Sequence, residues 1–301
     1  MDKYLVIILG PTGIGKTSMA IKVAKHFKTE IISSDSRQVY KETKIGTAVP
    51  SEEELKEVVH HQIATKSVKD YYSASIYEQE VLVIAGQLFN EHNLLVMAGG
   101  SGLYIDAVCK GIDELPDVDP ELRNELIKEL DEYGIESIRA KLKKIDPGYY
   151  EKVDLRNPKR ILKALEISIM TGKPYSSQLT SPKKDRPFKT IKIGLNMDRE
   201  QLHKRINRRV DIMIDEGLEM EAKGLYPQRG YNALNTVGYK EFFDYFENKH
   251  SREEAIELIK RNTRRYARRQ LTWFRRDKEI KWFGPNEHNA VIKEIENNIL
   301  T

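Results

Sequence analysis

Cysteine is almost absent from this 301-residue chain, which holds a single one at Cys109. A disulfide within the chain is therefore excluded, and a zinc site built from thiolates is nearly so. We interpret Cys109 as a small buried apolar side chain rather than a nucleophile. No apolar run approaches the roughly 20 residues that a membrane-spanning helix needs, and internal repeats and low-complexity tracts are also missing.

The composition is that of a soluble globular protein, with 40% hydrophobic and 32% charged residues. Its length suits one large domain or two smaller ones, with ample material for a core. The opening stretch MDKYLVIILG has too short an apolar run for a secretory signal and no cleavage site. We therefore expect a cytoplasmic protein that does not bind membranes.

The clearest chemistry in the sequence lies in the glycine-rich stretch GPTGIGKT, residues 10–17. It follows an apolar run at 4–9 and precedes residues 18–27, whose apolar side chains repeat at helical spacing. This order predicts a phosphate-binding loop, in which successive backbone N–H groups surround a polyphosphate. In such a loop Lys16 reaches the outer phosphates and the hydroxyl of Thr17 can hold Mg²⁺. The loop alone leaves open whose phosphates it binds.

Strand and helix signals alternate over the first hundred residues. This alternation predicts an α/β fold, a phosphate-loop core with a parallel sheet and helices on both of its faces. We expect strands at 4–9, 30–34 and 94–98. We also expect a helix at 75–90, where Ser75 and Glu78 would form a capping box.

The pattern changes near residue 115, where prolines begin to separate charged helical stretches. We expect helices at 122–133, 135–142 and 158–171, and the strand signal returns only at 190–196. The sequence therefore predicts two domains, a core of residues 1–115 and 188–301 and a helical insertion of residues 116–187. Within the second part of the core we expect a helix at 199–223, a basic helix, and an edge strand near 281–283.

Three polar motifs follow the expected strands, where sites in parallel sheets gather. They are the phosphate loop, residues 35–38 (Asp-Ser-Arg-Gln) and residues 100–102 (Gly-Ser-Gly). Asp35 could ligate magnesium through water, cap its own turn, or take a proton from an acceptor substrate. Arg37 and Gln38 favour a functional role, because a guanidinium and an amide beside a carboxylate suit a base edge or a phosphate.

Positive charge is concentrated near the end of the chain, although the net charge is only +4. Residues 260–281 hold ten lysines or arginines against two acidic residues, so this stretch carries +8 and the remainder −4. A capping box of Ser251 and Glu254 begins a helix with apolar residues on one face and most arginines on the other. Because like charges repel, this density favours binding of nucleic-acid phosphates over a merely solvated face.

Ten further motifs accompany the phosphate loop and occur in a fixed order. They are SSDSRQVY from Ser33, IGTAVP from Ile45, His60-His61, YSAS from Tyr72, GGSGLY from Gly99, RNPKRILKALEI from Arg156, TGKPYS from Thr171, LHKRINRRVDIM from Leu202, VGYKE from Val237 and RRYARRQLTWFRR from Arg264. With these motifs the chain closely resembles the bacterial tRNA dimethylallyltransferases, or isopentenyl tRNA transferases, from Leu5 to Arg276.

The resemblance implies an activity. These enzymes transfer a dimethylallyl group from dimethylallyl diphosphate to the N6 amine of adenine 37 beside the tRNA anticodon, releasing diphosphate. It implies that Asp35 is the catalytic base, aided by Lys16, Thr17 and Ser101, and that Mg²⁺, held by Thr17, is the cofactor. We expect a monomer whose partners are the tRNA anticodon stem-loop and dimethylallyl diphosphate.

The resemblance also implies two sets of binding residues. Contacts to the diphosphate are expected from Gly10, Pro11, Thr12, Gly13, Ile14, Gly15, Lys16, Thr17, Arg205 and Arg209, although the sequence does not decide which arginine among 205, 208 and 209 takes part. Contacts to tRNA are expected from Asp35, Ser36, Arg37, Gln38, Ser101, Arg123, Lys159, Arg160, Ile161, Leu162, Lys163, Asn235, Thr236, Val237, Gly238, Tyr239 and Lys240.

His60 and His61 do not predict a metal site. Adjacent side chains of a strand point to opposite faces, so the pair is a poor chelate, and the zinc finger of eukaryotic relatives is lacking. The sequence departs from the usual family pattern in KETKIGTAVP, which has a less hydrophobic residue before IGTA and no lysine before the proline.

Other readings compete with the tRNA prenyl transferase. An adenylate isopentenyltransferase would share the loop and the aspartate but act on free AMP, ADP or ATP. The helical insertion and the arginine-rich helix argue against it, because a mononucleotide needs no such footprint. A small-molecule kinase with a phosphate loop, or a nucleic-acid-binding module with a vestigial loop, is the third reading.

The basic helix generates a prediction about salt. Replacing Arg261 and Arg268 by alanine should weaken tRNA binding and lower the slope of log affinity against log salt by roughly one per arginine, because fewer counterions are released. Filter binding over a salt series measures the slope, with the Lys25→Ala/Lys28→Ala variant as control. A wild-type slope in the arginine variant would show that these arginines form an ordinary solvated surface and do not bind tRNA phosphates.

Overall fold

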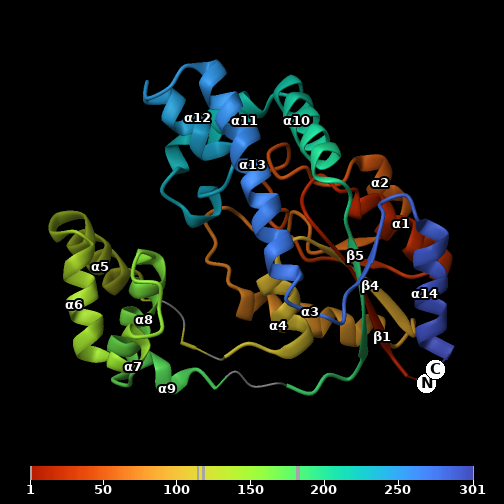
Figure 1. The fold of residues 1–301 in the computed structure, drawn as a ribbon, viewed down its shortest axis with the longest axis horizontal. Helices are drawn as coiled ribbons and strands as arrows, with labels where there is room; N and C mark the ends of the chain where they lie inside the picture. The colour runs from red at the N-terminus through yellow and green to blue at the C-terminus, as the bar shows by residue number, and fades with distance from the viewer. Residues whose placement is uncertain (1, 114, 117–118, 181–183, 301) are drawn as a thin grey trace. The chain divides into compact units, whose positions relative to one another are not determined.

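The computed structural model describes residues 2–113, 115–116, 119–180 and 184–300. The chain divides into two compact units (Figure 1). Unit 1 consists of residues 1–109 and 185–301, and unit 2 of residues 110–184. Among the described residues no helix is long and apolar enough to cross a membrane.

Unit 1 is built on a sheet of six parallel strands, which confirms the predicted α/β fold. The strands are β1 (Tyr4–Leu9), β2 (Ile31–Ser33), β3 (His60–His61), β4 (Leu94–Gly99), β5 (Lys189–Leu195) and β6 (Lys281–Phe283), in the order β3-β2-β4-β1-β5-β6. The last strand lies at the edge, as expected. Central β1 is buried along its whole length, as strands of a doubly covered parallel sheet are.

Helices cover both faces of this sheet. Val6 and Ile8 share a core with apolar residues of α1 and α14, while Leu5 and Ile7, which point to the opposite face, are also fully buried. The helices of unit 1 are α1 (Lys16–Phe27), α2 (Glu52–Glu57), α3 (Ala74–Leu88), α4 (Gly102–Lys110), α10 (Arg199–Asp215), α11 (Leu218–Leu225), α12 (Tyr239–Phe246), α13 (Arg252–Phe274) and α14 (His288–Leu300). Two short 3₁₀ helices, Tyr226–Gln228 and Asn232–Leu234, join α11 to α12.

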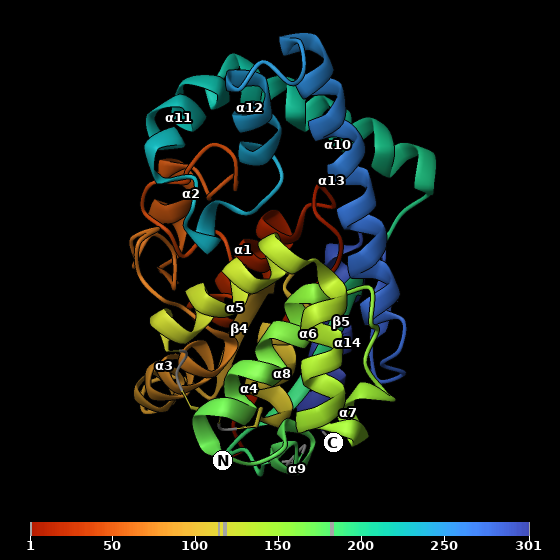
Figure 2. The same ribbon diagram turned by 90° about the vertical axis from the view of Figure 1, so that its left-hand side faces the viewer.

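The described part of unit 2 is helical. It holds α5 (Pro120–Tyr133), α6 (Ile135–Ile145), α7 (Pro147–Tyr150), α8 (Pro158–Thr171) and α9 (Tyr175–Gln178), and Figure 2 shows α5, α6 and α8 packed side by side. Proline is the first residue of α5, α7 and α8, and each of these prolines follows a capping Asp or Asn. Proline is tolerated there because an N–H group in the first turn of a helix has no carbonyl partner within the helix. The bundle closes over its own apolar core, which includes Leu126, Leu142 and Leu165.

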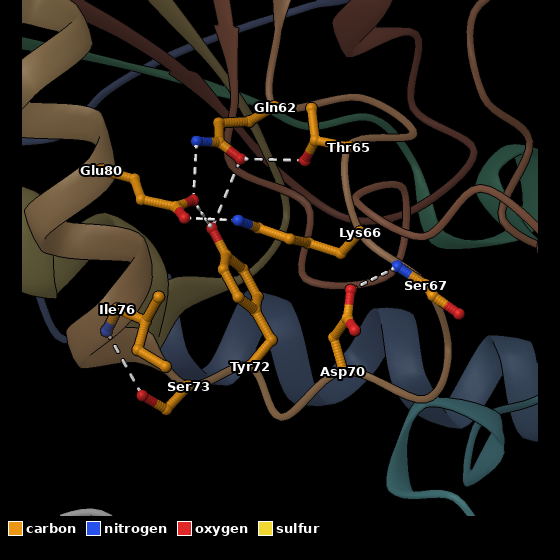
Figure 3. A network of polar contacts seen from close by, with 9 residues as sticks. All are labelled: Gln62, Thr65, Lys66, Ser67, Asp70, Tyr72, Ser73, Ile76 and Glu80. Carbon is orange, nitrogen blue, oxygen red and sulfur yellow. Dashed lines mark hydrogen bonds and ion pairs between the residues drawn. The ribbon is translucent and has the colours of Figure 1, made fainter.

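Two sequence predictions about helices are wrong. The helix expected at 199–223 is two helices, because Gly217 adopts φ 100° and the chain turns between α10 and α11. The capping box expected at Ser75 and Glu78 does not form. Ser73 caps α3 by accepting a hydrogen bond from the Ile76 amide (Figure 3), so the helix begins two residues before the expected cap could act.

Glu78 instead forms a buried ion pair. Its carboxylate lies 2.6 Å from the guanidinium of Arg186, which also donates to the carbonyl oxygens of Ala107 and Val108. This cluster fixes the chain where it returns from unit 2. We expected Cys109, which follows Val108 in this cluster, to be buried, but it is partly exposed.

The segment before α3 is held by a separate polar network. Glu80 accepts hydrogen bonds from Tyr72, Gln62 and Lys66, and Asp70 accepts one from the amide of Ser67 (Figure 3). Burial and the neighbouring carboxylate raise the pKa of Tyr72, so its hydroxyl stays a donor. The YSAS motif thus serves the architecture of unit 1.

Candidate active site at the carboxyl ends of the strands

The register of the sheet brings three loops together. Leu9 at the end of β1 is opposite Gly99 of β4, and Ser33 of β2 is opposite Ala98. The phosphate loop, the turn at residues 35–38 and the loop at residues 100–102 therefore emerge side by side. This is the position at which parallel α/β sheets bind ligands.

The phosphate loop offers a set of unused backbone donors. Gly13 has φ 79°, a left-handed conformation that turns the chain into the start of α1. Among the described residues, no acceptor meets the N–H groups of Gly13, Gly15, Lys16 and Thr17. Unpaired amides at a helix N-terminus favour an anion. The loop is therefore arranged to surround phosphate oxygens.

Lys16 lies over this loop, with its ammonium nitrogen 2.9 Å from the carbonyl oxygen of Pro11. Desolvation lowers the pKa of Lys16 to about 8, Asp35 acts in the opposite direction, and Arg209 lowers the pKa further. Desolvation also lowers the pKa of Arg209, although Asp35 again opposes the shift. Two cations and one carboxylate thus share this end of the sheet.

Helix α10 supplies arginines beside the loop. The guanidinium of Arg205 lies 3.4 Å from where a side chain on Gly15 would begin, and Arg209 interacts with Lys16 and Asp35. Arg205 and Arg208 are both exposed, whereas Arg209 is partly buried. The structure therefore brings Arg205 and Arg209 to the loop, and we propose these two as the diphosphate contacts below.

Asp35 caps its own turn, one of the roles left open by the sequence. Its Oδ1 accepts hydrogen bonds from the amides of Arg37, at 2.9 Å, and Gln38, at 3.4 Å. Its Oδ2 accepts none from the described residues. Capping and proton transfer are therefore compatible, because each needs a different oxygen of the carboxylate.

Ser101 ties the same turn to the end of β4. Its hydroxyl accepts a hydrogen bond from the amide of Ser36 at 2.9 Å and lies 3.1 Å from the Ser36 hydroxyl. It does not cap the N-terminus of α4, which directly follows it. Tyr266 of α13 lies near Ser101, and burial with Asp35 nearby raises the pKa of Tyr266 to about 12.

A cavity of about 520 Å³ in unit 1 opens beside these groups. Its lining holds both polar and apolar side chains. The polar lining includes Thr12, Asp35, Ser36, Arg37, Thr47, Arg209, Asn235, Thr236, Lys240, Asn262 and Tyr266, and the apolar lining includes Val210, Met213, Leu218, Val237 and Ile259. The mixture suits a ligand with a charged end and a hydrocarbon part.

We expected the side chains of Arg37 and Gln38 to point the same way as the carboxylate of Asp35, but the structure directs them to different partners. Arg37 donates to the carbonyl oxygens of Asn232 and Ala233, and Gln38 donates to those of Thr47 and Ala48. Both side chains therefore hold neighbouring loops in place. Arg37 lines the cavity, but Gln38 does not.

Residues 235–240 divide in the same way. Asn235, Thr236, Val237, Gly238 and Lys240 line the cavity. Tyr239 is fully buried and donates to Glu221 at 2.7 Å, and this carboxylate also accepts from the amides of residues 44–46. The side chain of Tyr239 is thus unavailable to tRNA.

The expected tRNA contacts in unit 2 include core residues. Ile161 and Leu162 are buried in the helical bundle, whereas Lys159 and Arg160 are exposed and Lys163 is partly exposed. Arg123 lies 3.1 Å from the buried carboxylate of Glu166. Desolvation raises the pKa of Glu166 against the opposing charges of Arg123 and Lys163. Helix α8 thus directs Lys159 and Arg160 outward, while Ile161 and Leu162 lie in the core of the bundle.

The described residues contain no cluster of three or more His, Cys, Asp or Glu suited to a metal. His61 pairs with Glu30 at 2.6 Å, and His60 lies beside the carbonyl of Val58. Thr17, however, has a hydroxyl without a hydrogen-bond partner among the described residues, at the start of the phosphate loop helix. Magnesium takes few protein ligands when substrate phosphates supply the rest, so this donor set fits it.

Sequence reasoning missed two side chains of this site, Tyr266 and Gln270 of α13. Tyr266 lines the cavity, and the amide of Gln270 contacts the phosphate loop. Both lie on the inward face of the helix, which the apolar spacing identifies. These two polar residues on a largely apolar helix face were the feature of the sequence that could have pointed to a role in the site.

Together the sheet, the free amides and the nearby carboxylate define a phosphate-loop α/β protein whose site is arranged for an anion beside an acidic residue. Comparison with known proteins narrows this class. A model of the IPP transferase family matches residues 38–277, and the chain belongs to this family.

Individual relatives agree over the full length. The chain is 54% identical to the tRNA dimethylallyltransferase of Christiangramia forsetii over 100% of both chains, and 51% identical to tRNA dimethylallyltransferase 1 of Bacteroides fragilis over 99% of both. Among solved structures, the tRNA isopentenylpyrophosphate transferase of Bacillus halodurans is 38% identical with a TM-score of 0.72, covering 100% of this chain and 96% of that one. A eukaryotic dimethylallyltransferase acting on tRNA is 25% identical with a TM-score of 0.77, covering 99% and 78%.

The low pKa of Lys16 predicts a pH dependence. Its charged form, which attracts phosphate, prevails below about pH 8 and is lost above it. Affinity for diphosphate should therefore fall by about tenfold more between pH 7 and pH 9 in the wild type than in Lys16→Met, which should bind weakly throughout. Isothermal titration calorimetry measures the affinity of both proteins for diphosphate at each pH. Comparing the two proteins removes the effect of protonation of diphosphate itself. Parallel curves for the two proteins would contradict the assignment.

Proposed function

We propose that this protein transfers a dimethylallyl group from dimethylallyl diphosphate to the N6 amine of adenine 37 in tRNA, releasing diphosphate. One observation carries the proposal: amides of the phosphate loop after β1 and one carboxylate oxygen of Asp35 after β2, none with a hydrogen-bond partner among the described residues, lie at the same end of the sheet beside one cavity. Family membership and full-length similarity to tRNA dimethylallyltransferases support it.

The leaving group presents the main electrostatic demand of this reaction. Negative charge grows on the departing diphosphate as the allylic C–O bond breaks, while the allyl carbon shares positive charge with its double bond. We assign the stabilisation of that charge to the free amides of Gly13, Gly15, Lys16 and Thr17, to the ammonium of Lys16, and to Arg205 and Arg209. The apolar side chains that line the cavity, including Val210 and Met213, suit the five-carbon group.

The acceptor amine needs a base, because its lone pair is delocalised into the adenine ring. Asp35 Oδ2 takes the N6 proton as the C–N bond forms. The turn hydrogen bonds to Oδ1 keep this carboxylate in place, and Ser101 fixes the turn through Ser36. Tyr266, beside Ser101, completes the wall on the acceptor side.

Magnesium is the cofactor we propose, and Thr17 would hold it through its side-chain hydroxyl. When bound, it neutralises charge on the diphosphate. Thr17 contributes its hydroxyl from the first turn of α1, and the helix places that hydroxyl beside the same amides that receive the phosphates.

tRNA binds through positive charge and an extruded base. An adenine must leave its stack to reach an interior carboxylate. We propose contacts from Asp35, Ser36, Arg37, Ser101 and the cavity residues at 235–240, from the exposed Lys159 and Arg160, and from arginines of α13. Gln38, Arg123 and Lys163 support these surfaces, and the enzyme acts in the cytoplasm as a monomer.

Label transfer tests this function against its alternatives. Purified protein receives radiolabelled dimethylallyl diphosphate with unmodified tRNA or with AMP, and separately ATP with a kinase acceptor. We expect label on tRNA alone. Label moving only to AMP would favour an adenylate isopentenyltransferase, and phosphoryl transfer from ATP would favour a kinase.

The two oxygens of Asp35 permit a sharp test of its role. Asp35→Asn keeps an acceptor for the amides of Arg37 and Gln38 but removes the basic oxygen, whereas Asp35→Ala removes both. Turnover should fall by a factor of about a hundred or more in each variant, while Asp35→Asn still binds tRNA. Single-turnover kinetics and filter binding provide the two numbers. Near-normal turnover of Asp35→Asn would limit Asp35 to turn capping.

A further inference from the structure

Gln270 connects the long basic helix α13 to two loops of the site. Its Oε1 accepts a hydrogen bond from the amide of Thr12 in the phosphate loop, at 2.8 Å. Its Nε2 donates to the carbonyl oxygen of Gly100, at 2.9 Å. The side chain is buried, with 6% of its surface exposed. One amide group thus spans the gap between the loops that follow β1 and β4.

The arrangement is specific in space and in polarity. A side chain on Gly100 would begin 2.2 Å from Gln270 Nε2, so the approach requires glycine at this position. The bridge needs an acceptor toward Thr12 and a donor toward Gly100, which a neutral carboxamide supplies and a carboxylate does not. Gln270 binds the amide of Thr12 and leaves the amides of Gly13, Gly15, Lys16 and Thr17 without an acceptor among the described residues.

The two bonded loops have different tasks in the proposed reaction. The phosphate loop holds the leaving group, while Gly100 directly precedes Ser101, which fixes the turn that carries Asp35. The distance between them sets the approach of the amine to the allyl carbon. An error of about 1 Å in such an alignment can cost a factor of a hundred in rate.

We propose that Gln270 is a positioning residue, which sets the diphosphate cradle relative to the Ser101–Asp35 side of the site from the helix that carries the tRNA-binding arginines. This inference rests on the proposed function and deepens it. Gln270 touches neither reacting group; it acts through Thr12 and Gly100.

The first test is the isosteric Gln270→Glu variant. Its carboxylate would face the Gly100 carbonyl, so burial and repulsion should raise the pKa of the new group. The protonated acid can accept from Thr12 and donate to Gly100, as the amide does. The ratio of kcat/KM for dimethylallyl diphosphate, variant over wild type, should therefore rise by about tenfold as pH falls from 8.5 to 6. Taking the ratio to the wild type removes the titration of Lys16. A flat ratio would overturn the proposal.

The second test separates positioning from mere stability. Gln270→Leu loses both bonds, and Trp273→Phe, one turn along α13, loses the bond from Trp273 Nε1 to Asp106 on α4, at 2.9 Å. Trp273→Phe serves as the control for weakened attachment of the helix. Well below both melting temperatures, Gln270→Leu should lose about ten- to a hundredfold in kcat/KM for the diphosphate while its tRNA affinity stays normal. Equal kcat/KM values in the two variants would reduce Gln270 to a structural bond.

Binding of inorganic diphosphate, measured by calorimetry, adds a readout that does not depend on turnover. We expect weaker binding in Gln270→Leu than in Trp273→Phe. If the wild type transferred no prenyl group, the proposed function would fail, whereas this binding difference would still report whether Gln270 shapes the cradle. If the wild type were active and neither binding nor kcat/KM changed in Gln270→Leu, the inference alone would fail.

Discussion

The close approach of three loops at one edge of the sheet is the constraint on which the site depends. Leu9, Gly99 and Ser33 end neighbouring strands at nearly the same level. At Gly99 any side chain would begin 2.4 Å from the backbone of Ser34, so the strands can end together only because this residue lacks one. The resulting juxtaposition puts phosphate-binding amides beside a carboxylate, although the amides attract a phosphate and the carboxylate repels it.

Electrostatic balance makes that juxtaposition tolerable. Lys16 and Arg209 each interact with Asp35, and each is itself less readily charged because it is desolvated. A diphosphate entering this field meets free amides and cations on one side, whereas the carboxylate is held back by its own turn. In the proposed reaction, this arrangement separates the groups that stabilise the leaving diphosphate from the carboxylate that removes a proton, within one cavity.

Much of the fold was predictable because it follows from periodicity. Strands β1, β4 and β5, helix α8 and the capping box of α13 lie where the spacing of apolar residues and the caps place them. The break at Gly217 was missed because α10 and α11 continue one apolar pattern across it. The short helix α2 and the terminal helix α14 were not predicted at all.

The individual motifs of the site were predictable, but the long-range hydrogen-bond partners of its side chains were not. The phosphate loop and Asp35 could be found from local motifs, since each acts through residues close in sequence. Gln38, Arg37 and Gln270 form hydrogen bonds to residues 9 to 258 positions away. Such partners are decided by tertiary packing, so a motif shows that the side chain matters without showing what it contacts.

The central claim is that a phosphate loop holds a prenyl diphosphate whose carbon is attacked by a tRNA adenine. It is tested most directly by nucleoside mass spectrometry of an unmodified anticodon stem-loop after incubation with protein, dimethylallyl diphosphate and Mg²⁺. The account predicts one five-carbon group on the N6 of the adenine at position 37, with one diphosphate released for each group added. An unmodified adenine, under conditions in which the protein is folded and binds the RNA, would contradict it.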